Sequence, residues 1–258
     1  MKIAIATIYP ILGDINKNIA LHQKYIDMAI QYKADAILFP ELSLTGYFVK
    51  DLVPDLAIPG DKLNIFDSSK IDIIYGAIES ERYQYYNTGV YLHRGGVSHI
   101  HRKIYLPNYG LFDEARFFHK GSSLITFDAG QYKAGILVCE DLWHPENIAA
   151  LASSGLDILY ALIASPINGI DEHGITSANF YKDMAKVYAK LYTTNIIISN
   201  RSGVEDGFSF WGEAIACDPY GHFLKQEKPD EYMTIVEIHK ADLINARWHL
   251  PLLRDRLQ

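Results

Sequence analysis

Residues 134–145 read A-G-I-L-V-C-E-D-L-W-H-P, and this stretch decides how the rest of the chain is interpreted. Its first five residues form an apolar run typical of a buried strand, and the run stops at Cys139. Open α/β sheets place their chemistry at the carboxyl ends of such strands, where a cysteine can act as a nucleophile. A structural core cysteine is the competing interpretation, because free cysteine is among the most buried residue types.

The composition is that of a soluble globular protein. The chain has 258 residues, of which 49% are hydrophobic and 21% are charged. This length fits one large domain or two small ones. Because no repeat, low-complexity segment or linker-like break is found, we expect a single domain over residues 1–258.

Charge and cysteine content narrow the function classes. The net charge is −7 and no Lys/Arg run exceeds two residues, which argues against a nucleic-acid or anionic membrane surface. The chain has two cysteines, Cys139 and Cys217, which indicates a reducing compartment, so we expect a cytoplasmic protein. No Cys/His spacing matches a structural zinc site. Residues 3–9 are predicted to be a first strand rather than an export signal, and no apolar stretch approaches the roughly 18 residues that span a bilayer.

Hydrophobic periodicity predicts alternating strands and helices. Strands are predicted at 3–9, 35–39, 71–79, 85–93, 97–103, 124–127, 133–138, 156–163 and 196–199, and helices at 15–33, 145–153, 174–192 and 241–248. Strand–helix–strand units imply parallel pairing, and hairpins at residues 94–96 and 128–130 add antiparallel pairs. The fold class is therefore α/β, with a mixed sheet or two stacked sheets covered by helices.

The remaining segments are predicted to be irregular or to contain short strands. Residues 42–69 and 104–120 are predicted to be long loops, which in a compact domain are more often functional than idle. The region from residue 208 to 239 is predicted to hold short strands that turn at 219–221 and 228–230. We expect the last helix to be followed by an extended tail.

Three chemically complementary residues stand at predicted strand ends. Glu41 follows D-A-I-L-F-P, Lys103 ends V-S-H-I-H-R-K, and Cys139 ends A-G-I-L-V. A lysine favours thiolate over thiol and can face an oxyanion, while a carboxylate can move the thiol proton to a leaving amine. Taken singly, Glu41 could be a helix N-terminal acid and Lys103 a solvated strand end.

Three motifs in order give the chain a family resemblance. They are P-E-L-S-L-T-G-Y at 40–47, H-R-K-I-Y-L-P-N-Y-G-L-F-D-E-A-R-F-F at 101–118, and V-C-E-D-L-W-H-P at 138–145. Together they resemble the nitrilase, or carbon–nitrogen hydrolase, superfamily over nearly the whole chain. The resemblance implies an α-β-β-α sandwich with mixed sheets that assembles as a homodimer or higher homo-oligomer.

The resemblance also implies a site without a metal or an organic cofactor. Glu41 would be the general base and acid, Lys103 the oxyanion stabiliser and Cys139 the nucleophile. Glu114 would be a second acid that positions the lysine or the substrate amide, and the backbone N–H of Glu140 would face the oxyanion. Cys217 matches nothing catalytic and is interpreted as structural.

Within the superfamily, the chain is most similar to the glutamine amidase domain of glutamine-dependent NAD synthetases. Those domains carry P-E-L-x-L-T-G-Y, R-K-x-x-L-P-N-Y-G-x-F-D-E-x-R and C-E-D-x-W, and residues 164–166 resemble their S-A-S-P turn. This likeness implies that Tyr47, Tyr109, Trp143 and Ser165 line an acyl pocket. Packing is the alternative role for the tyrosines, since the chain has 18 of them.

The chain departs from that pattern in three places. The segment S-P-I-N-G-I-D-E-H-G lacks the basic residues that follow S-P in those domains, and it brings Asp171 and Glu172 instead. Residues 210–214 (F-W-G-E-A) stand where many members have G-x-S. The sequence also reaches Gln258 without an S-G-G-x-D-S ATP motif, so we expect a stand-alone protein.

The sequence therefore predicts an amidohydrolase that cleaves a small carboxamide to acid and ammonia through an acyl-thioester on Cys139. The two acids favour a neutral or cationic substrate. A glutamine amidase subunit that supplies ammonia to a separate synthetase partner is one alternative, and a non-catalytic binding member of the fold is another. A nitrile substrate is chemically possible, since the same thiolate can attack a nitrile carbon.

Overall fold

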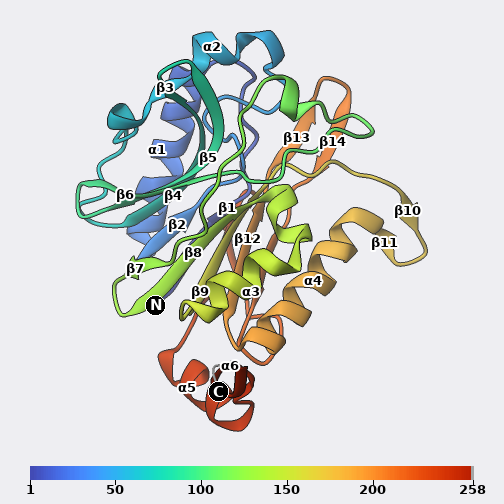
Figure 1. Cartoon of the computed structure of the whole chain (residues 1–258). Helices are drawn as coiled ribbons and strands as arrows, with labels where there is room; N and C mark the ends of the chain where they lie inside the picture. Colours follow the sequence, from blue (N-terminus) through green and yellow to red (C-terminus); the bar gives the residue numbers. More distant parts are fainter. Residues whose placement is uncertain (257–258) are drawn as a thin grey trace.

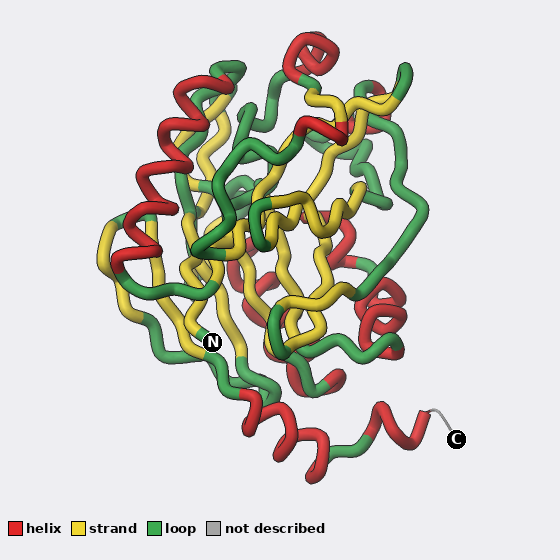
Figure 2. The backbone as a smooth tube through the Cα atoms, turned by 90° about the vertical axis from the view of Figure 1, so that its left-hand side faces the viewer, coloured by secondary structure: helices red, strands yellow, loops and turns green. Residues whose placement is uncertain are grey.

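Two β-sheets stack face to face, and helices cover the outer side of each sheet (Figure 1). The computed structural model describes residues 1–256, so the last two residues of the predicted domain lie outside the described part. Figure 2, turned by 90°, shows the strands lying between helices on the two outer sides. The protein thus has the predicted α/β, α-β-β-α sandwich fold.

The first sheet combines a parallel centre with antiparallel flanks. Its order is β16-β17-β1-β2-β4-β5-β6, and the short β3 pairs with β4. The strands are β1 (Lys2–Ala6), β2 (Ala36–Leu38), β3 (Ile58–Pro59), β4 (Asp72–Glu81), β5 (Gln84–His93), β6 (Gly96–Arg102), β16 (Glu227–Asp230) and β17 (Met233–Glu237). Strands β1, β2 and β4 run parallel, whereas β4-β5-β6 form an antiparallel meander.

The second sheet has the order β15-β12-β9-β8-β7. Its strands are β7 (Phe127–Ala129), β8 (Tyr132–Val138), β9 (Ile158–Ile163), β12 (Asn195–Asn200) and β15 (Ala214–Cys217). The central strands β8, β9 and β12 are parallel and in register, with Val138 beside Leu162 and Leu162 beside Ser199. Two small antiparallel ladders lie outside the sheets, β10 (Ile170–Asp171) with β11 (Gly174–Ile175) and β13 (Ser202–Glu205) with β14 (Phe208–Trp211).

Four of the six α-helices in the described residues follow predicted helical segments, whereas one short helix lies inside the predicted loop 42–69. They are α1 (Ile15–Gln31), α2 (Val53–Leu56), α3 (Pro145–Ser153), α4 (Thr176–Tyr192), α5 (Lys240–His249) and α6 (Leu252–Arg256). Helix α1 begins where predicted, because the Asp14 side chain accepts a hydrogen bond from the backbone N–H of Lys17 at 3.1 Å. Helices α3 and α4 lie against the second sheet (Figure 1).

The side chains of β1 point alternately into two hydrophobic cores, which joins the layers of the fold. Ile3 and Ile5 point into a core shared with the second sheet, while Ala4 and Ala6 lie beneath the buried face of α1. Because strand side chains alternate between the two faces, one strand contributes to both cores. Apolar residues on both faces explain the continuous hydrophobic runs seen in the sequence.

The predicted ends of β1, β6 and β7 need correction. Strand β1 stops at Ala6 rather than residue 9, and β6 ends at Arg102, so Lys103 follows the strand. The β7-β8 turn lies at residues 130–131 rather than 128–130, because Gly130 supplies the positive φ of +64° that the turn requires.

Two predictions near the C-terminus were wrong. Residues 228–230 form part of β16 instead of a turn, and Pro229 is tolerated there because β16 is an edge strand. The tail is helical rather than extended: α6 follows Pro251, whose carbonyl accepts a hydrogen bond from the Asp255 N–H at 3.1 Å. Within residues 1–256, no helix is both long and apolar enough to cross a bilayer.

Candidate active site

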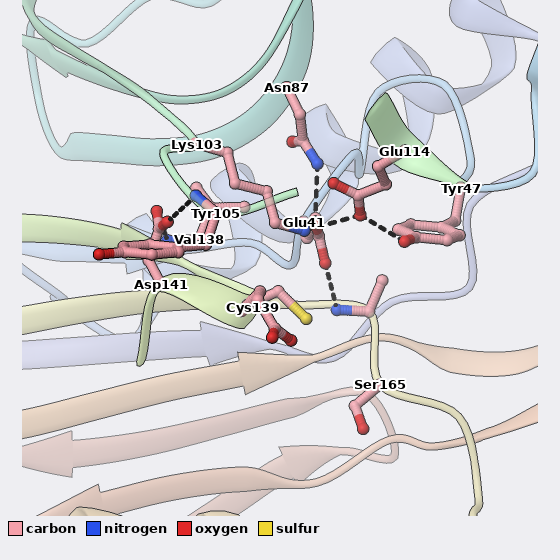
Figure 3. Close-up of polar contacts among 12 residues, drawn as sticks. Glu41, Tyr47, Asn87, Lys103, Tyr105, Glu114, Val138, Cys139, Asp141 and Ser165 are labelled. Carbon is pink, nitrogen blue, oxygen red and sulfur yellow. Dashed lines mark hydrogen bonds and ion pairs between the residues drawn. The ribbon is translucent and has the colours of Figure 1, made fainter. Parts of the chain in front are cut away.

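The predicted site residues follow the carboxyl ends of strands from both sheets. Glu41 lies just beyond β2, Lys103 directly after β6, Cys139 directly after β8, and Ser165 just beyond β9. Glu114 comes from a one-turn 3-10 helix, Glu114–Arg116, in the long loop that follows β6. Stacking of the two sheets brings these strand ends together (Figure 3).

Glu41 is buried and its two carboxylate oxygens are fully engaged. Oε1 accepts hydrogen bonds from Asn87 Nδ2 at 2.8 Å and Lys103 Nζ at 2.7 Å, and Oε2 accepts one from the Ala164 N–H at 2.9 Å. These contacts come from β5, from the end of β6 and from the end of β9. They fix the carboxylate between the two sheets.

Lys103 is fully buried and bridges two carboxylates. Its Nζ donates to Glu41 Oε1 and to Glu114 Oε1, both at 2.7 Å. Burial opposes the charge on Lys103, but the Glu114 and Glu41 carboxylates outweigh it, so its pKa is raised well above the usual lysine value. We call Glu41, Lys103 and Glu114 the charged cluster.

Glu114 completes the charged cluster in an unusual protonation state. Its Oε1 also accepts a hydrogen bond from the Tyr47 hydroxyl, while the buried Oε2 has no partner within the described residues. Burial raises the pKa of Glu114 to about 7, with Lys103 opposing the rise and the negative charge of Glu41 adding to it. This carboxyl therefore changes charge near neutral pH.

Cys139 opens a 3-10 helix, Cys139–Trp143, immediately after β8. Its φ of +47° is a left-handed conformation that costs a non-glycine residue on the order of 1 kcal/mol. The sulfur points toward the side of the site that holds the Glu41 carboxylate (Figure 3). A strained strand-to-helix turn of this kind is typical of positions that present a nucleophile.

The surroundings of Cys139 disfavour ionisation of its thiol. Burial and the negative charge of Glu41 raise its pKa well above the usual cysteine value, and the opposing effect of Lys103 is smaller. Lys103 thus favours the thiolate, as the sequence suggested, but its effect is outweighed by burial and by Glu41. Cys217, by contrast, is wholly buried in β15 and away from the charged cluster.

Asp141 holds the turn of Cys139 and the segment after Lys103 together. Its Oδ1 accepts the N–H groups of Ile104 and Tyr105, both at 2.9 Å, and its Oδ2 lies 3.2 Å from the Val138 N and 2.8 Å from His101 Nε2. The residue is completely buried. Sequence reasoning missed this role, although its position two residues after the cysteine was a signal.

A second buried pair positions Tyr47. Glu205 Oε1 accepts the backbone N–H groups of Tyr47 and Phe48, both at 2.7 Å, and Glu205 Oε2 pairs with the buried Arg201. The Tyr47 ring is therefore directed to Glu114. We expected Tyr47 in the acyl pocket, but it lines a separate cavity of about 50 Å³ beside Glu114.

The pocket in front of Cys139 has a volume of about 280 Å³. Three residues expected there, Tyr109, Trp143 and Ser165, line it together with Cys139 and Glu140. We call this space the acyl pocket. Its other walls include Pro107, Leu111, Phe112, Asn168, Phe180 and Tyr181.

Hydrogen bonds fix several of the pocket residues. Tyr109 donates its hydroxyl proton to Glu140 Oε2 at 2.7 Å, and the Ser165 backbone pairs with the side-chain amide of Asn200 at 2.8 and 3.0 Å. Trp143 Nε1 donates to the Tyr181 hydroxyl at 2.9 Å, and that hydroxyl lies 3.6 Å from Cys139 Sγ. None of the sequence motifs singled out Tyr181.

The acids that were expected to bias substrate charge do not line the acyl pocket. Asp171 lies in the exposed ladder β10-β11, and the Glu172 side chain is 85% exposed. The charge of this segment is therefore directed to solvent. Within residues 1–256, no three His, Cys, Asp or Glu side chains are arranged to hold a metal ion.

Comparison with known proteins identifies the family of the chain. The sequence pattern of the Carbon-nitrogen hydrolase family matches residues 2–247. A glutamine-dependent NAD(+) synthetase of Aquifex aeolicus (strain VF5) is 28% identical over 262 residues, covering 96% of this chain and 45% of that protein. A nitrilase of Pyrococcus abyssi (strain GE5 / Orsay) is 25% identical over 258 residues, covering 96% of this chain and 93% of that protein.

A solved structure extends the likeness to three dimensions. The glutamine-dependent NAD+ synthetase from Acinetobacter baumannii, in complex with adenosine diphosphate, superposes with a TM-score of 0.83 at 29% identity, covering 94% of this chain and 46% of that one. The chain thus spans less than half the length of the NAD synthetases it matches. With the family pattern over residues 2–247 and the α-β-β-α sandwich, the chain belongs to the carbon–nitrogen hydrolase family.

Proposed function

We propose that the protein is a cysteine-dependent amidohydrolase that cleaves a small carboxamide to a carboxylic acid and ammonia. The observation that carries this proposal is the buried hydrogen-bonded cluster of Glu41, Lys103 and Glu114 beside a strained Cys139 that opens onto a pocket. A buried, charge-paired lysine between two carboxylates is expensive to maintain as a purely structural feature. This arrangement of a lysine and two carboxylates suits a reaction in which protons are transferred and negative charge develops on the substrate.

In the first step, Glu41 takes the Cys139 proton as Sγ attacks the amide carbon. The carbon–oxygen double bond opens to an oxyanion, which the backbone N–H of Glu140 and the Lys103 ammonium stabilise. Lys103 has three N–H donors, and two of them bind the carboxylates of Glu41 and Glu114. The third is available to the oxyanion.

In the second step, Glu41 returns the proton to the leaving nitrogen, the carbon–nitrogen bond breaks and ammonia departs. Water then attacks the acyl-thioester with Glu41 as base, and Cys139 leaves with a proton as the acid is released. The raised thiol pKa fits this sequence, because the proton is transferred during attack rather than lost beforehand. Tyr181, 3.6 Å from Sγ, would stabilise the developing thiolate.

Ammonia supply to a separate synthetase partner is a second candidate function. The similarity to NAD synthetases over 94–96% of this chain favours it. It predicts that glutamine is hydrolysed and that its turnover rises when such a partner is added. If ammonia release from glutamine stays at the background rate with and without a partner, this second candidate is excluded.

Ammonia release from a panel of small amides tests the main proposal. Cys139→Ala should abolish turnover, whereas Cys217→Ala should retain it, since Cys217 is a buried cysteine remote from the charged cluster. Equal turnover in Cys139→Ala and the parent would contradict a thioester mechanism. An absence of amide turnover in the parent would favour a non-catalytic binding protein.

A further inference from the structure

Most of the surface of the acyl pocket is apolar, although hydroxyl and amide side chains also line it. Phe112, Trp143 and Phe180 supply aromatic faces, and Pro107 and Leu111 supply aliphatic ones. Trp143 and Phe180 stack with ring centroids 4.4 Å apart, which makes a flat surface. Such walls favour an apolar acyl group, because burying its surface away from water is favourable.

Within the described residues, Glu140 is the one charged residue that lines the acyl pocket. Glu140 follows the nucleophile and lines the pocket, where Tyr109 orients its carboxylate. No Lys or Arg lines the acyl pocket in the described part of the chain. Lys103 is wholly buried between Glu41 and Glu114, and Lys182 pairs with Glu213 at 2.6 Å.

A substrate carboxylate would therefore enter an apolar pocket without a cation and next to a carboxylate. Desolvating an unpaired anion is unfavourable, and a like charge nearby increases the cost. A methyl group or an ammonium at the same position meets neither penalty. An ammonium would face Glu140 and aromatic rings, which attract cations.

On the basis of the proposed function, we propose that the substrate is a carboxamide whose acyl group carries no negative charge. The acyl pocket accepts neutral apolar or cationic acyl groups and rejects the carboxylate of glutamine. Discrimination arises from Glu140 and from the absence of a basic residue in the wall. Asn168 is an exposed residue of the pocket wall. A cation introduced at this position would reverse the discrimination against anionic acyl groups.

Four amides with a five-carbon acyl chain and different charges test the inference. They are pentanamide (neutral), 5-aminopentanamide (cationic), glutaramate (anionic) and glutamine (zwitterionic). We expect kcat/KM for pentanamide to exceed that for glutaramate by about 100-fold, with glutamine also poor and 5-aminopentanamide accepted. A ratio of pentanamide to glutaramate or to glutamine below ten would overturn the inference.

Two variants test the origin of the selectivity. Glu140→Gln keeps the backbone N–H and an acceptor for Tyr109 but removes the charge, and Asn168→Lys adds a cation at the wall. Each should raise the glutaramate-to-pentanamide ratio of kcat/KM about tenfold. Because both substrates are measured in the same variant, a general loss of activity divides out. An unchanged ratio in both variants would contradict the assignment.

Calorimetric binding to Cys139→Ala separates this inference from the proposed reaction. That variant cannot form the thioester, so the affinities of the four amides report the pocket alone. Weak binding of glutaramate relative to pentanamide supports the inference even if the parent cleaves neither. Equal affinities would overturn it, whereas amides that bind in this order but are never cleaved would refute only the hydrolase proposal.

Discussion

The charged cluster and the walls of the acyl pocket differ in how firmly they are held. Glu41, Lys103 and Glu114 are at most 4% exposed, and each makes at least two hydrogen bonds. Tyr109, Trp143 and Phe180 are 41–55% exposed and contribute little to the core. Under the proposed function, the reacting groups are therefore held by the interior, while the side chains proposed to set selectivity can change without unfolding the protein.

The largest effect is expected when the cation is removed from the charged cluster. Lys103→Met removes the cation that pairs with two buried carboxylates and that, under the proposed function, stabilises the oxyanion. We expect amide turnover to fall by at least about 1,000-fold and the free energy of unfolding to fall by about 3–5 kcal/mol. Kinetics and urea titration measure both quantities.

A surface lysine provides the control for that change. Lys182→Met breaks a pair with Glu213 whose side chains are 31% and 43% exposed, so the free energy of unfolding should change by less than about 1 kcal/mol. If Lys103→Met kept more than a tenth of the parental turnover, Lys103 would not be part of the chemistry.

Substitution of Asp141 tests whether the positioning of Cys139 is as important as the charge of the cluster. Asp141→Asn weakens four contacts, to Ile104, Tyr105, Val138 and His101, that align Cys139 with the segment after Lys103. We expect kcat to fall about 10–100-fold with KM nearly unchanged, and the free energy of unfolding to fall by about 2 kcal/mol. Asp183→Asn, at a 71% exposed carboxylate, is the control. A rise in KM alone would contradict a positioning role.

Glu114 makes the charged cluster sensitive to pH. Its pKa rises from 4.5 to about 7 on folding, so the folded state holds this proton more tightly than the unfolded state. The resulting stabilisation is fully present below pH 4.5 and is lost as pH rises through 7. Relative to the parent, Glu114→Gln should therefore gain about 2 kcal/mol in the free energy of unfolding between pH 5 and pH 8. A constant difference across that range would contradict the raised pKa.

The smallest effect is expected at the pocket wall. Tyr109→Phe removes the hydrogen bond to Glu140 from a side chain that is 55% exposed. The free energy of unfolding should stay within about 0.5 kcal/mol of the parent, and KM should change by up to about fivefold with kcat within about twofold. A tenfold loss of kcat would show that this wall takes part in the chemistry and not only in selectivity.

The sequence predicted the fold and the neighbourhood of the site because both depend on local signals. Strand patterns in the sequence are followed by Glu41, Lys103 and Cys139, and parallel strands gather their carboxyl ends at one edge. The family resemblance of residues 101–118 added Glu114 to the candidate site, although no local pattern would single out this residue.

The remaining features depend on contacts between distant segments. Asp141 and Tyr181 are ordinary residue types whose partners lie 36–42 positions away, so their roles appear only when β6, β8 and α4 are assembled. Tyr47 was misplaced because Glu205, 158 residues later, holds its backbone and directs its ring to Glu114. The net rise in the Cys139 thiol pKa could not be predicted from the sequence, because it depends on burial between the two sheets.

Mass spectrometry of the intact protein after mixing with a turned-over amide tests the central claim most directly. We predict an adduct equal to the amide minus ammonia that maps to the peptide containing Cys139, is formed by Cys217→Ala and is absent from Cys139→Ala. Ammonia release by Cys139→Ala at the parental rate, or an adduct that maps to another residue, would contradict the account.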